Sequence, residues 1–223
     1  MKTTKRQSGE KEVYRWLGYL VCTKTELPVG FKLTLANRND GPEMPELLGE
    51  LKARHPEVAD KTEYVVADGG YDGKETYRFI VEEVKATPII PLNLRTEKEP
   101  PGICNHQGTP VCMAWYPMSY AGYDNGRLKY RAPCVVGKEK KECALRVPCF
   151  DRRGYGLVVK LRIKDDYWRY TAVPRETKKW RRLYRRRTAV ERVNSRLKKH
   201  FLVDDLRVQG MAKVKLRVSL GYW

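Results

Sequence analysis

The chain has 223 residues and carries 45 Lys or Arg against 27 Asp or Glu, which gives a net charge of +18. Its 41% hydrophobic and 10% aromatic residues exclude a disordered polycation, because such a chain holds too few apolar side chains to form a core. The length fits one domain with an insertion or two small domains. A charge of this sign predicts a polyanionic partner.

The excess charge is concentrated in the last third of the chain. Residues 1–151 hold 23 Lys or Arg and 21 Asp or Glu, whereas residues 152–223 hold 22 and 6. No apolar run approaches the roughly 20 residues that span a bilayer, and the start MKTTKRQSGEKE lacks the apolar stretch of a signal peptide. We therefore expect a cytoplasmic protein. No amphipathic helix with a bulky aromatic face accompanies the charge, which argues against a membrane as the partner.

Residues 13–92 follow a polar, flexible start at 1–12 and alternate between strand and helix signals. The strands YRWLGYLVCT and FKLTLAN flank the turn TELPVG and predict an antiparallel hairpin. A helix with a leucine stripe is expected after Asn39 and Asp40, then the strand TEYVVAD. Asp72, with Glu75 three residues on, is expected to cap a helix that runs to about Lys85. With the strand TPIIPL, the order β-β-α-β-α-β predicts a mixed sheet covered by helices.

The composition changes after residue 92. Pro, Gly and Cys become more frequent over 93–151, and the Asn-Gly pair in YDNGRLKY predicts a tight hairpin turn, so we expect a small β insertion there. Residues 152–223 are expected to complete the core, with strands at YGLVVKLRI and YWRYTAV. A helix is expected from about Arg175 to His200.

This basic helix retains a single acid, Glu191, among seven basic residues between 184 and 199. At 100° per residue, Tyr184, Arg187, Glu191 and Lys198 share an arc of about 60° at the border of an apolar face. Glu191 either forms an ordinary surface ion pair with Arg187 or belongs to a functional site.

The spacing of these four residues resembles the Y-R-E-K signature of a large branch of bacterial insertion-sequence transposases of the DDE type. The stretch ADGGYD at 67–72 resembles the second catalytic stretch of that family, with Asp68 at the end of a strand. The preceding hairpin, LANRND and PRETKKWRRLYRRRTAVER follow the family's usual order, so the resemblance covers nearly the whole chain. It implies an α/β fold, a ribonuclease H-like mixed sheet flanked by helices, with a small Cys-containing β insertion.

The resemblance also implies a reaction: DNA cleavage and strand transfer assisted by two Mg²⁺ (or Mn²⁺) ions about 4 Å apart. Asp68 and Glu191 would be catalytic metal ligands. The partner would be double-stranded DNA, both the ends of the element and the target. Tyr184, Arg187 and Lys198 would contact DNA near the reacting phosphate. The outer basic residues would hold the DNA backbone with little regard to sequence; they are Arg185, Arg192, Arg196 and Lys199.

One departure from the family pattern concerns a third carboxylate, an Asp that the family carries on a first strand before the hairpin. No Asp precedes Asp40 in this sequence. We therefore expect the carboxy-terminal portion of a transposase without the first strand, which binds DNA but does not cut it alone. The complete protein is expected to form a homo-oligomer associated with the bacterial nucleoid. Two alternatives are a non-catalytic DNA-binding regulator derived from a transposase and a basic RNA-binding protein.

Cysteines and aromatic residues leave two further questions open. Five of the six Cys fall between 104 and 149, where spacings lack the two-residue knuckles of a strong zinc motif. They are either free thiols or a structural Zn²⁺ site formed by Cys112, Cys134, Cys143 and Cys149. Aromatic residues interleave with the basic ones of the last third, where they either complete the core or stack on unpaired bases; they are Trp168, Tyr170, Trp180 and Tyr184.

Overall fold

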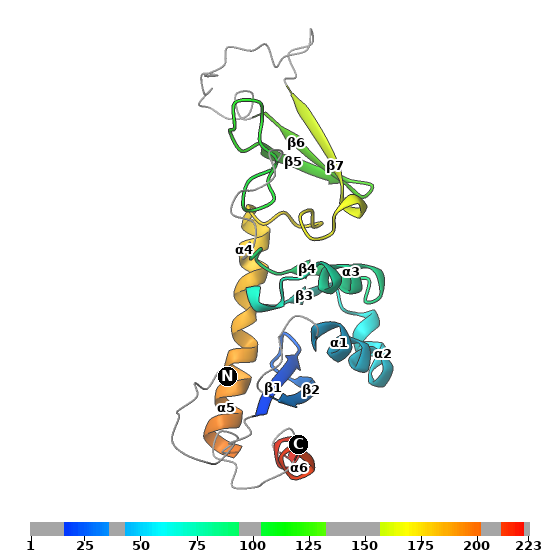
Figure 1. The fold of residues 1–223 in the computed structure, drawn as a ribbon, viewed down its shortest axis with the longest axis vertical. Helices are drawn as coiled ribbons and strands as arrows, with labels where there is room; N and C mark the ends of the chain where they lie inside the picture. Colours follow the sequence, from blue (N-terminus) through cyan, green and yellow to red (C-terminus); the bar gives the residue numbers. More distant parts are fainter. Residues whose placement is uncertain (1–15, 36–42, 94–103, 133–156, 202–210, 221–223) are drawn as a thin grey trace. The chain divides into compact units, whose positions relative to one another are not determined.

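A computed structural model describes residues 16–35, 43–93, 104–132, 157–201 and 211–220. The chain divides into two compact units, each described by itself below. The first unit comprises residues 1–61 and 186–223, and the second comprises residues 62–185. Figure 1 shows their helices and strands.

The first unit begins with the antiparallel hairpin of β1 (Trp16–Cys22) and β2 (Pro28–Leu35), which confirms the hairpin predicted from the sequence. Its turn is closed by two backbone hydrogen bonds, from Thr23 N–H to the Leu27 carbonyl and from Glu26 N–H to the Thr23 carbonyl. Glu26 has a positive φ of 65°. That conformation is uncommon for a residue with a side chain, and it lies at the tip of the turn.

Helices α1 (Glu43–Arg54) and α2 (Pro56–Asp60) follow the hairpin. The predicted leucine stripe is confirmed, because Leu47, Leu48 and Leu51 are buried, and α1 packs on β2. Lys32 Nζ on β2 lies 2.6 Å from Glu43 Oε2 and also pairs with Glu46. Asn39 and Asp40 lie outside the described residues. The contact between α1 and β2 thus combines an apolar stripe with a nearly buried ion pair.

Helix α5 (Thr188–Phe201) packs on β1 in the same unit. Its buried side chains are Ala189, Val193 and Leu197, four residues apart, as expected for one face of a helix. Helix α6 (Met211–Leu220) buries Val214 and Val218 with the same spacing. The helix predicted from about Arg175 to His200 is confirmed as two helices, α4 (Lys178–Tyr184) and α5, which are separated by the short 3-10 turn η3 (Arg185–Arg187).

The second unit contains a parallel strand pair, β3 (Tyr64–Val66) and β4 (Thr87–Ile89). The 3-10 turn η1 (Gly69–Tyr71) and helix α3 (Lys74–Glu82) connect them, as a parallel connection requires. Ile89 is fully buried against Val173, Trp180 and Leu183, the last two on α4 (Lys178–Tyr184). Both strands were predicted from the sequence, and α4 covers one of them.

A three-stranded antiparallel sheet forms the rest of this unit, with β5 (Ser119–Asp124), β6 (Arg127–Arg131) and β7 (Val158–Arg162) in that order. The predicted Asn-Gly turn joins β5 to β6, where Asn125 and Gly126 have φ values of 47° and 76°. Two positive φ values are the mark of a type I′ turn. A hydrophobic cluster underlies the sheet, formed by Met118, Leu128, Tyr130, Ile163 and Tyr170.

The strand predicted at YWRYTAV is wrong. After the 3-10 turn η2 (Ile163–Asp165), the chain turns around Asp166, whose Oδ1 accepts hydrogen bonds from the N–H groups of Trp168 and Arg169. Tyr170 N–H donates to the Asp166 carbonyl at 2.9 Å. The Asp side chain competes with a strand ladder for these donors, which is why β-forming residues here adopt a turn.

Of the four aromatic residues considered for base stacking, three lie in the core: Trp168, Tyr170 and Trp180 are each at most 9% exposed. Tyr184 stacks on Trp180 with ring centroids 4.9 Å apart. The mixed α/β organisation predicted from the sequence is confirmed, but the described strands form three separate sheets and not one continuous sheet. Among the described residues, no helix has the length and apolar character needed to cross a bilayer.

Candidate active site

Asp68 lies two residues beyond the end of β3, in the turn that leads into α3. Its side chain caps η1 by accepting a hydrogen bond from Gly70 N–H at 2.8 Å through Oδ1. The side chain is exposed. Residues at the carboxyl end of a parallel strand are well placed for binding, because the strand ends there and the side chain faces solvent. Asp68 is therefore a carboxylate held at a defined position with one oxygen still available.

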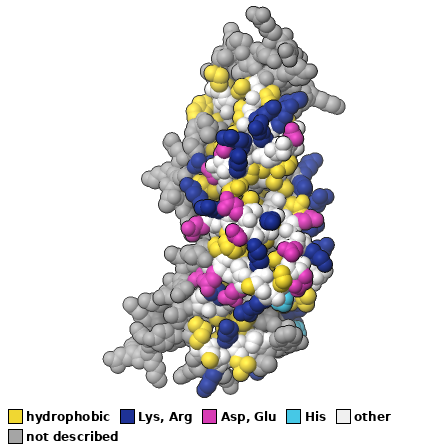
Figure 2. All heavy atoms as spheres, turned by 90° about the vertical axis from the view of Figure 1, so that its right-hand side faces the viewer, with side chains coloured by type: hydrophobic (Ala, Val, Ile, Leu, Met, Phe, Trp, Pro, Cys, Tyr) yellow, Lys and Arg dark blue, Asp and Glu magenta, His cyan; other side chains and the backbone are white. Residues whose placement is uncertain are grey.

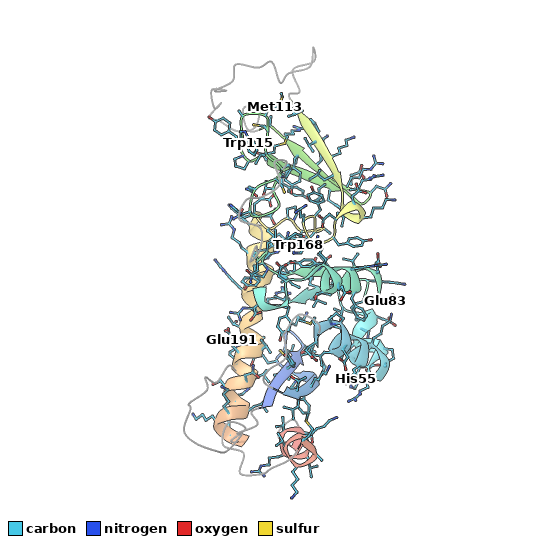
Figure 3. All side chains as sticks on the ribbon, in the orientation of Figure 1. His55, Glu83, Met113, Trp115, Trp168 and Glu191 are labelled. Carbon is cyan, nitrogen blue, oxygen red and sulfur yellow. The ribbon has the colours of Figure 1, made fainter. Side chains whose placement is uncertain are left out.

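Asp72, expected to cap α3, has a different role. Helix α3 begins at Lys74 with Gly73 before it, and no side chain caps it. The Asp72 carboxylate instead accepts hydrogen bonds from Trp168 Nε1 at 2.8 Å and from Asn93 N–H at 2.6 Å, one on each oxygen. Trp168 is labelled in Figure 3. Asp72 thus fixes the Asp68 turn to two segments far along the chain.

Arg175 forms a second anchor behind this turn. Its guanidinium is buried and donates to the carbonyls of Ile90, Trp168 and Arg169, at 3.1, 2.8 and 2.9 Å. It also donates to Tyr77 Oη at 3.0 Å, and Tyr77 Oη donates in turn to the Ile90 carbonyl at 3.0 Å. Burial raises the pKa of the Tyr77 phenol, so this hydroxyl stays protonated. The network ties the chain after β4 to residues 168–175.

Glu191, the single acid of the basic helix, lies on α5 in the first unit and is labelled in Figure 3. Its Oε1 is 2.8 Å from Arg187 Nη1, and the Glu191 side chain is 51% exposed. The ion pair considered from the sequence is therefore present. Because the 3-10 turn at 185–187 interrupts the helix, the angular arc calculated for a continuous helix does not extend to Tyr184, the last residue of α4.

The turn between β1 and β2 carries a paired carboxylate, Glu26, whose role was not predicted from the sequence. Glu26 accepts from Arg192 Nε at 2.5 Å, and its other oxygen lies 2.6 Å from Arg196 Nη2. The two arginines are one helical turn apart on α5, so a single carboxylate spans both. These hydrogen bonds hold the pKa of Glu26 below its usual range. The only signal in the sequence was an acid in a hairpin turn, which does not identify its partners.

The remaining basic candidates of this region are exposed: Arg185, Lys198 and Lys199. Elsewhere on the molecule, Figure 2 shows Lys and Arg side chains interspersed with Asp and Glu side chains. Arg192 and Arg196 are also more than half exposed, although both are paired with Glu26. A polyanion can therefore reach the basic side chains of α5, but at Arg192 and Arg196 it would compete with the carboxylate of Glu26.

The donor chemistry of Asp68 and Glu191 fits a divalent cation, because Mg²⁺ prefers carboxylate oxygens. Gly70 engages one oxygen of Asp68 and Arg187 engages one oxygen of Glu191. In the described part of the chain, the second oxygen of each carboxylate has no hydrogen-bond partner. Within residues 16–35, 43–93, 104–132, 157–201 and 211–220, no group of three or more His, Cys, Asp or Glu is suited to a metal ion.

The zinc hypothesis concerns residues that lie mostly outside the described part of the chain. Cys134, Cys143 and Cys149 fall within 133–156, and only Cys112 is described, as a half-buried free thiol. The hypothesis stays a prediction.

Comparison with known proteins adds one finding. A family model described as "Transposase DDE domain" matches residues 2–222. No curated protein and no solved structure matches the chain. The match spans both units and all of the residues discussed above.

Proposed function

The chain belongs to the family of transposases with a DDE domain, and from this membership we propose that it provides residues for cutting DNA and joining the freed end to a target. The family match over residues 2–222 is the observation that carries the proposal. In this reaction a phosphodiester bond breaks and another forms by in-line displacement at phosphorus.

Within this proposal, Asp68 and Glu191 hold divalent cations in a ribonuclease H-like core. Bound ions of this kind would activate the attacking oxygen and stabilise the leaving one. Support comes from the exposure of both carboxylates and from the oxygen that each keeps without a hydrogen bond in the described residues. Asp72 is not assigned to the metal, because both of its oxygens accept hydrogen bonds from Asn93 and Trp168.

The basic residues of α5 and the adjoining turn would bind DNA, in the manner of the Y-R-E-K branch. Arg187 can both pair with Glu191 and bind DNA, since its guanidinium contacts the carboxylate while 30% of its side chain stays exposed. An arginine between a carboxylate and a phosphate can orient both, because its planar fork offers several N–H donors. Tyr184, Lys198 and Lys199 would extend the contact along the DNA backbone.

The test measures DNA binding with and without a divalent ion, so that it reports on metal ligands even when no strand is cut. A fluorescent duplex carrying the ends of the element is titrated with the full chain in Ca²⁺, in Mg²⁺ and in EDTA. We expect the divalent ions to tighten binding, and the substitutions Asp68→Asn and Glu191→Gln to remove this effect while binding in EDTA is retained. Any Mg²⁺-dependent strand cleavage should disappear in the same two variants.

Matched controls are Asp60→Asn and Glu57→Gln, which make the same chemical changes at exposed positions of α2. Both should behave like the unaltered chain. If divalent ions have no effect on binding, or if the controls lose it as fully as Asp68→Asn and Glu191→Gln, the assignment of the metal ligands is wrong.

A further inference from the structure

The second unit contains a pocket of about 520 Å³ that plays no part in the proposed metal site. One side of the pocket is formed by the end of α3 and the start of β4. The other side is formed by the β5–β6 turn and the residues after β7. This volume falls within the range of about 300 to 1,000 Å³ typical of ligand sites.

The charge of this lining is one-sided. It contains Lys85, Arg127, Arg162 and Lys164, and no Asp or Glu. Only Arg162 has a carboxylate partner among the described residues, through Asp165 Oδ2 at 2.9 Å. All four basic side chains are exposed. The other three cations have no carboxylate partner among the described residues, so the pocket has a positive potential, which favours an anionic ligand.

The walls of the pocket are fixed by backbone contacts. At the end of α3, Lys85 has a φ of 60°, and Ala86 N–H donates to the Ile80 carbonyl across it. Glycine usually occupies such a left-handed position, because it alone avoids the steric cost of a side chain. The opposite wall is held by a 3.0 Å hydrogen bond from Ile163 N–H to the Gly126 carbonyl. The basic side chains therefore project from an ordered frame.

Aromatic side chains add a second type of contact. Tyr123, at the end of β5, is 51% exposed, and Tyr167 is half-buried. An exposed tyrosine ring beside lysine and arginine is the combination used to bind nucleic-acid strands, in which the cations pair with phosphates and the ring stacks on a base. A small inorganic anion would need the charges but not the ring.

Strand direction separates this pocket from Asp68. Strands β3 and β4 are parallel, with Tyr64 opposite Thr87 and Val66 opposite Ile89. Thr87, the first residue of β4, and Pro88 line the pocket, whereas Asp68 follows the carboxyl end of β3 and is not part of the lining. The pocket is thus a different site from the turn that carries the proposed metal ligand.

We propose that this pocket binds a segment of a DNA strand outside the reacting phosphate, with Lys85, Arg127 and Lys164 on the phosphates and Tyr123 on a base. This inference rests on the proposed function for the identity of the nucleic acid. The second unit would then have a DNA-binding site that is separate from the basic residues of α5.

The test compares two triple variants of the full chain, both verified as folded by circular dichroism and thermal unfolding. One neutralises the pocket through Lys85→Gln, Arg127→Gln and Lys164→Gln. The control removes the same charge from exposed lysines of the first unit through Lys24→Gln, Lys61→Gln and Lys215→Gln. Binding of a fluorescent single strand and of a duplex is measured in EDTA across a range of salt concentrations.

We expect the pocket variant to bind at least about ten-fold more weakly than the control, with the salt slope reduced by about 3 because three phosphate contacts are lost. Tyr123→Leu should weaken binding of the single strand by about ten-fold, while Tyr123→Phe keeps the ring and the affinity. Equal binding by the two triple variants overturns the proposal. The proposal is also overturned if millimolar inorganic phosphate fully displaces DNA from the pocket and Tyr123→Leu has no effect on DNA binding. Because EDTA removes any metal effect, these results are independent of those for Asp68 and Glu191.

Discussion

Trp168 donates its indole N–H to Asp72, 96 positions earlier in the chain, across 2.8 Å. The other oxygen of the same carboxylate accepts Asn93 N–H. One side chain thereby joins the turn after Asp68, the chain that leaves β4 and the chain that returns after β7. This contact and those around Arg175 position the candidate catalytic carboxylate, and they lead to the first two predictions.

Asp72→Ala should destabilise the fold by about 2 kcal/mol, because the Trp168 and Asn93 donors lose their acceptor in a partly buried place. Trp168→Phe removes one of these bonds and keeps most of the ring. A double-mutant cycle with both changes, measured by urea unfolding, should give a coupling energy of about 1 kcal/mol. Strict additivity of the two changes would show that the bond does not contribute to stability.

Arg175→Met should cost about 3 kcal/mol, since three carbonyls and the Tyr77 hydroxyl lose a buried donor. Arg175→Lys should recover only part of this loss, because an ammonium group cannot reach all four acceptors as a planar guanidinium does. Chemical denaturation of the three proteins measures the order. Equal stability of the Lys variant and the unaltered chain would contradict it.

The pairing of Glu26 with two arginines predicts a dependence of stability on pH. The hydrogen bonds from Arg192 and Arg196 lower the pKa of Glu26 in the folded state. A depressed carboxyl pKa stabilises the fold above the unfolded value of about 4.3, and this stabilisation is lost as pH falls through the lower, folded-state pKa. Thermal unfolding between pH 3 and pH 6 should therefore show a smaller loss of stability in Glu26→Gln, which cannot ionise. Identical pH profiles would disprove the assignment.

Lys32 and Glu43 form a nearly buried ion pair, with side chains 14% and 4% exposed. Glu43→Gln should cost about 3 kcal/mol, because it leaves the ammonium group poorly compensated, although Glu46 still pairs with it. The double change Lys32→Met with Glu43→Leu should be much less harmful, since no charge is then buried. Urea unfolding of the single and double variants tests this. A double variant as unstable as the single one would show that the charges are not the cause.

The same pair has a consequence at high pH. Burial lowers the pKa of Lys32, but its two carboxylates outweigh that effect and the net pKa is raised. Its contribution is therefore complete below the unfolded value of about 10.4 and is lost as pH rises through the higher folded-state pKa. The difference in stability between the unaltered chain and Lys32→Met should shrink above that value.

Local patterns in the sequence predicted the elements whose signals lie within a few residues. The hairpin of β1 and β2, the Asn125-Gly126 turn and the helices of the basic region follow from alternation, turn chemistry and helical spacing. The strand expected at 167–173 is absent because Asp166 binds the nearby N–H groups in a turn. The strand propensities of single residues do not account for hydrogen bonds that a neighbouring Asp side chain accepts from the backbone.

The candidate site was predicted only where the residues themselves carry the chemistry. Asp68 and Glu191 were chosen from the sequence as metal ligands, and this assignment stays a prediction. The partners of Asp72, Arg175 and Glu26 were missed, because most of these contacts join residues that are between 21 and 170 positions apart. Without a second sequence to compare, no local signal links an acid in a turn to an indole or to two arginines so far along the chain.

The two hydrogen bonds that Asp72 accepts also affect how the chain tolerates changes in length. Asn93 and Trp168 mark the two ends of a long excursion that contains β5, β6 and β7, and both ends are fastened to one carboxylate. The entropy needed to close a loop grows only with the logarithm of its length. Residues can therefore be added to the connections between these strands at small cost in loop closure, while the base of the excursion, and Asp68 beside it, keeps its geometry.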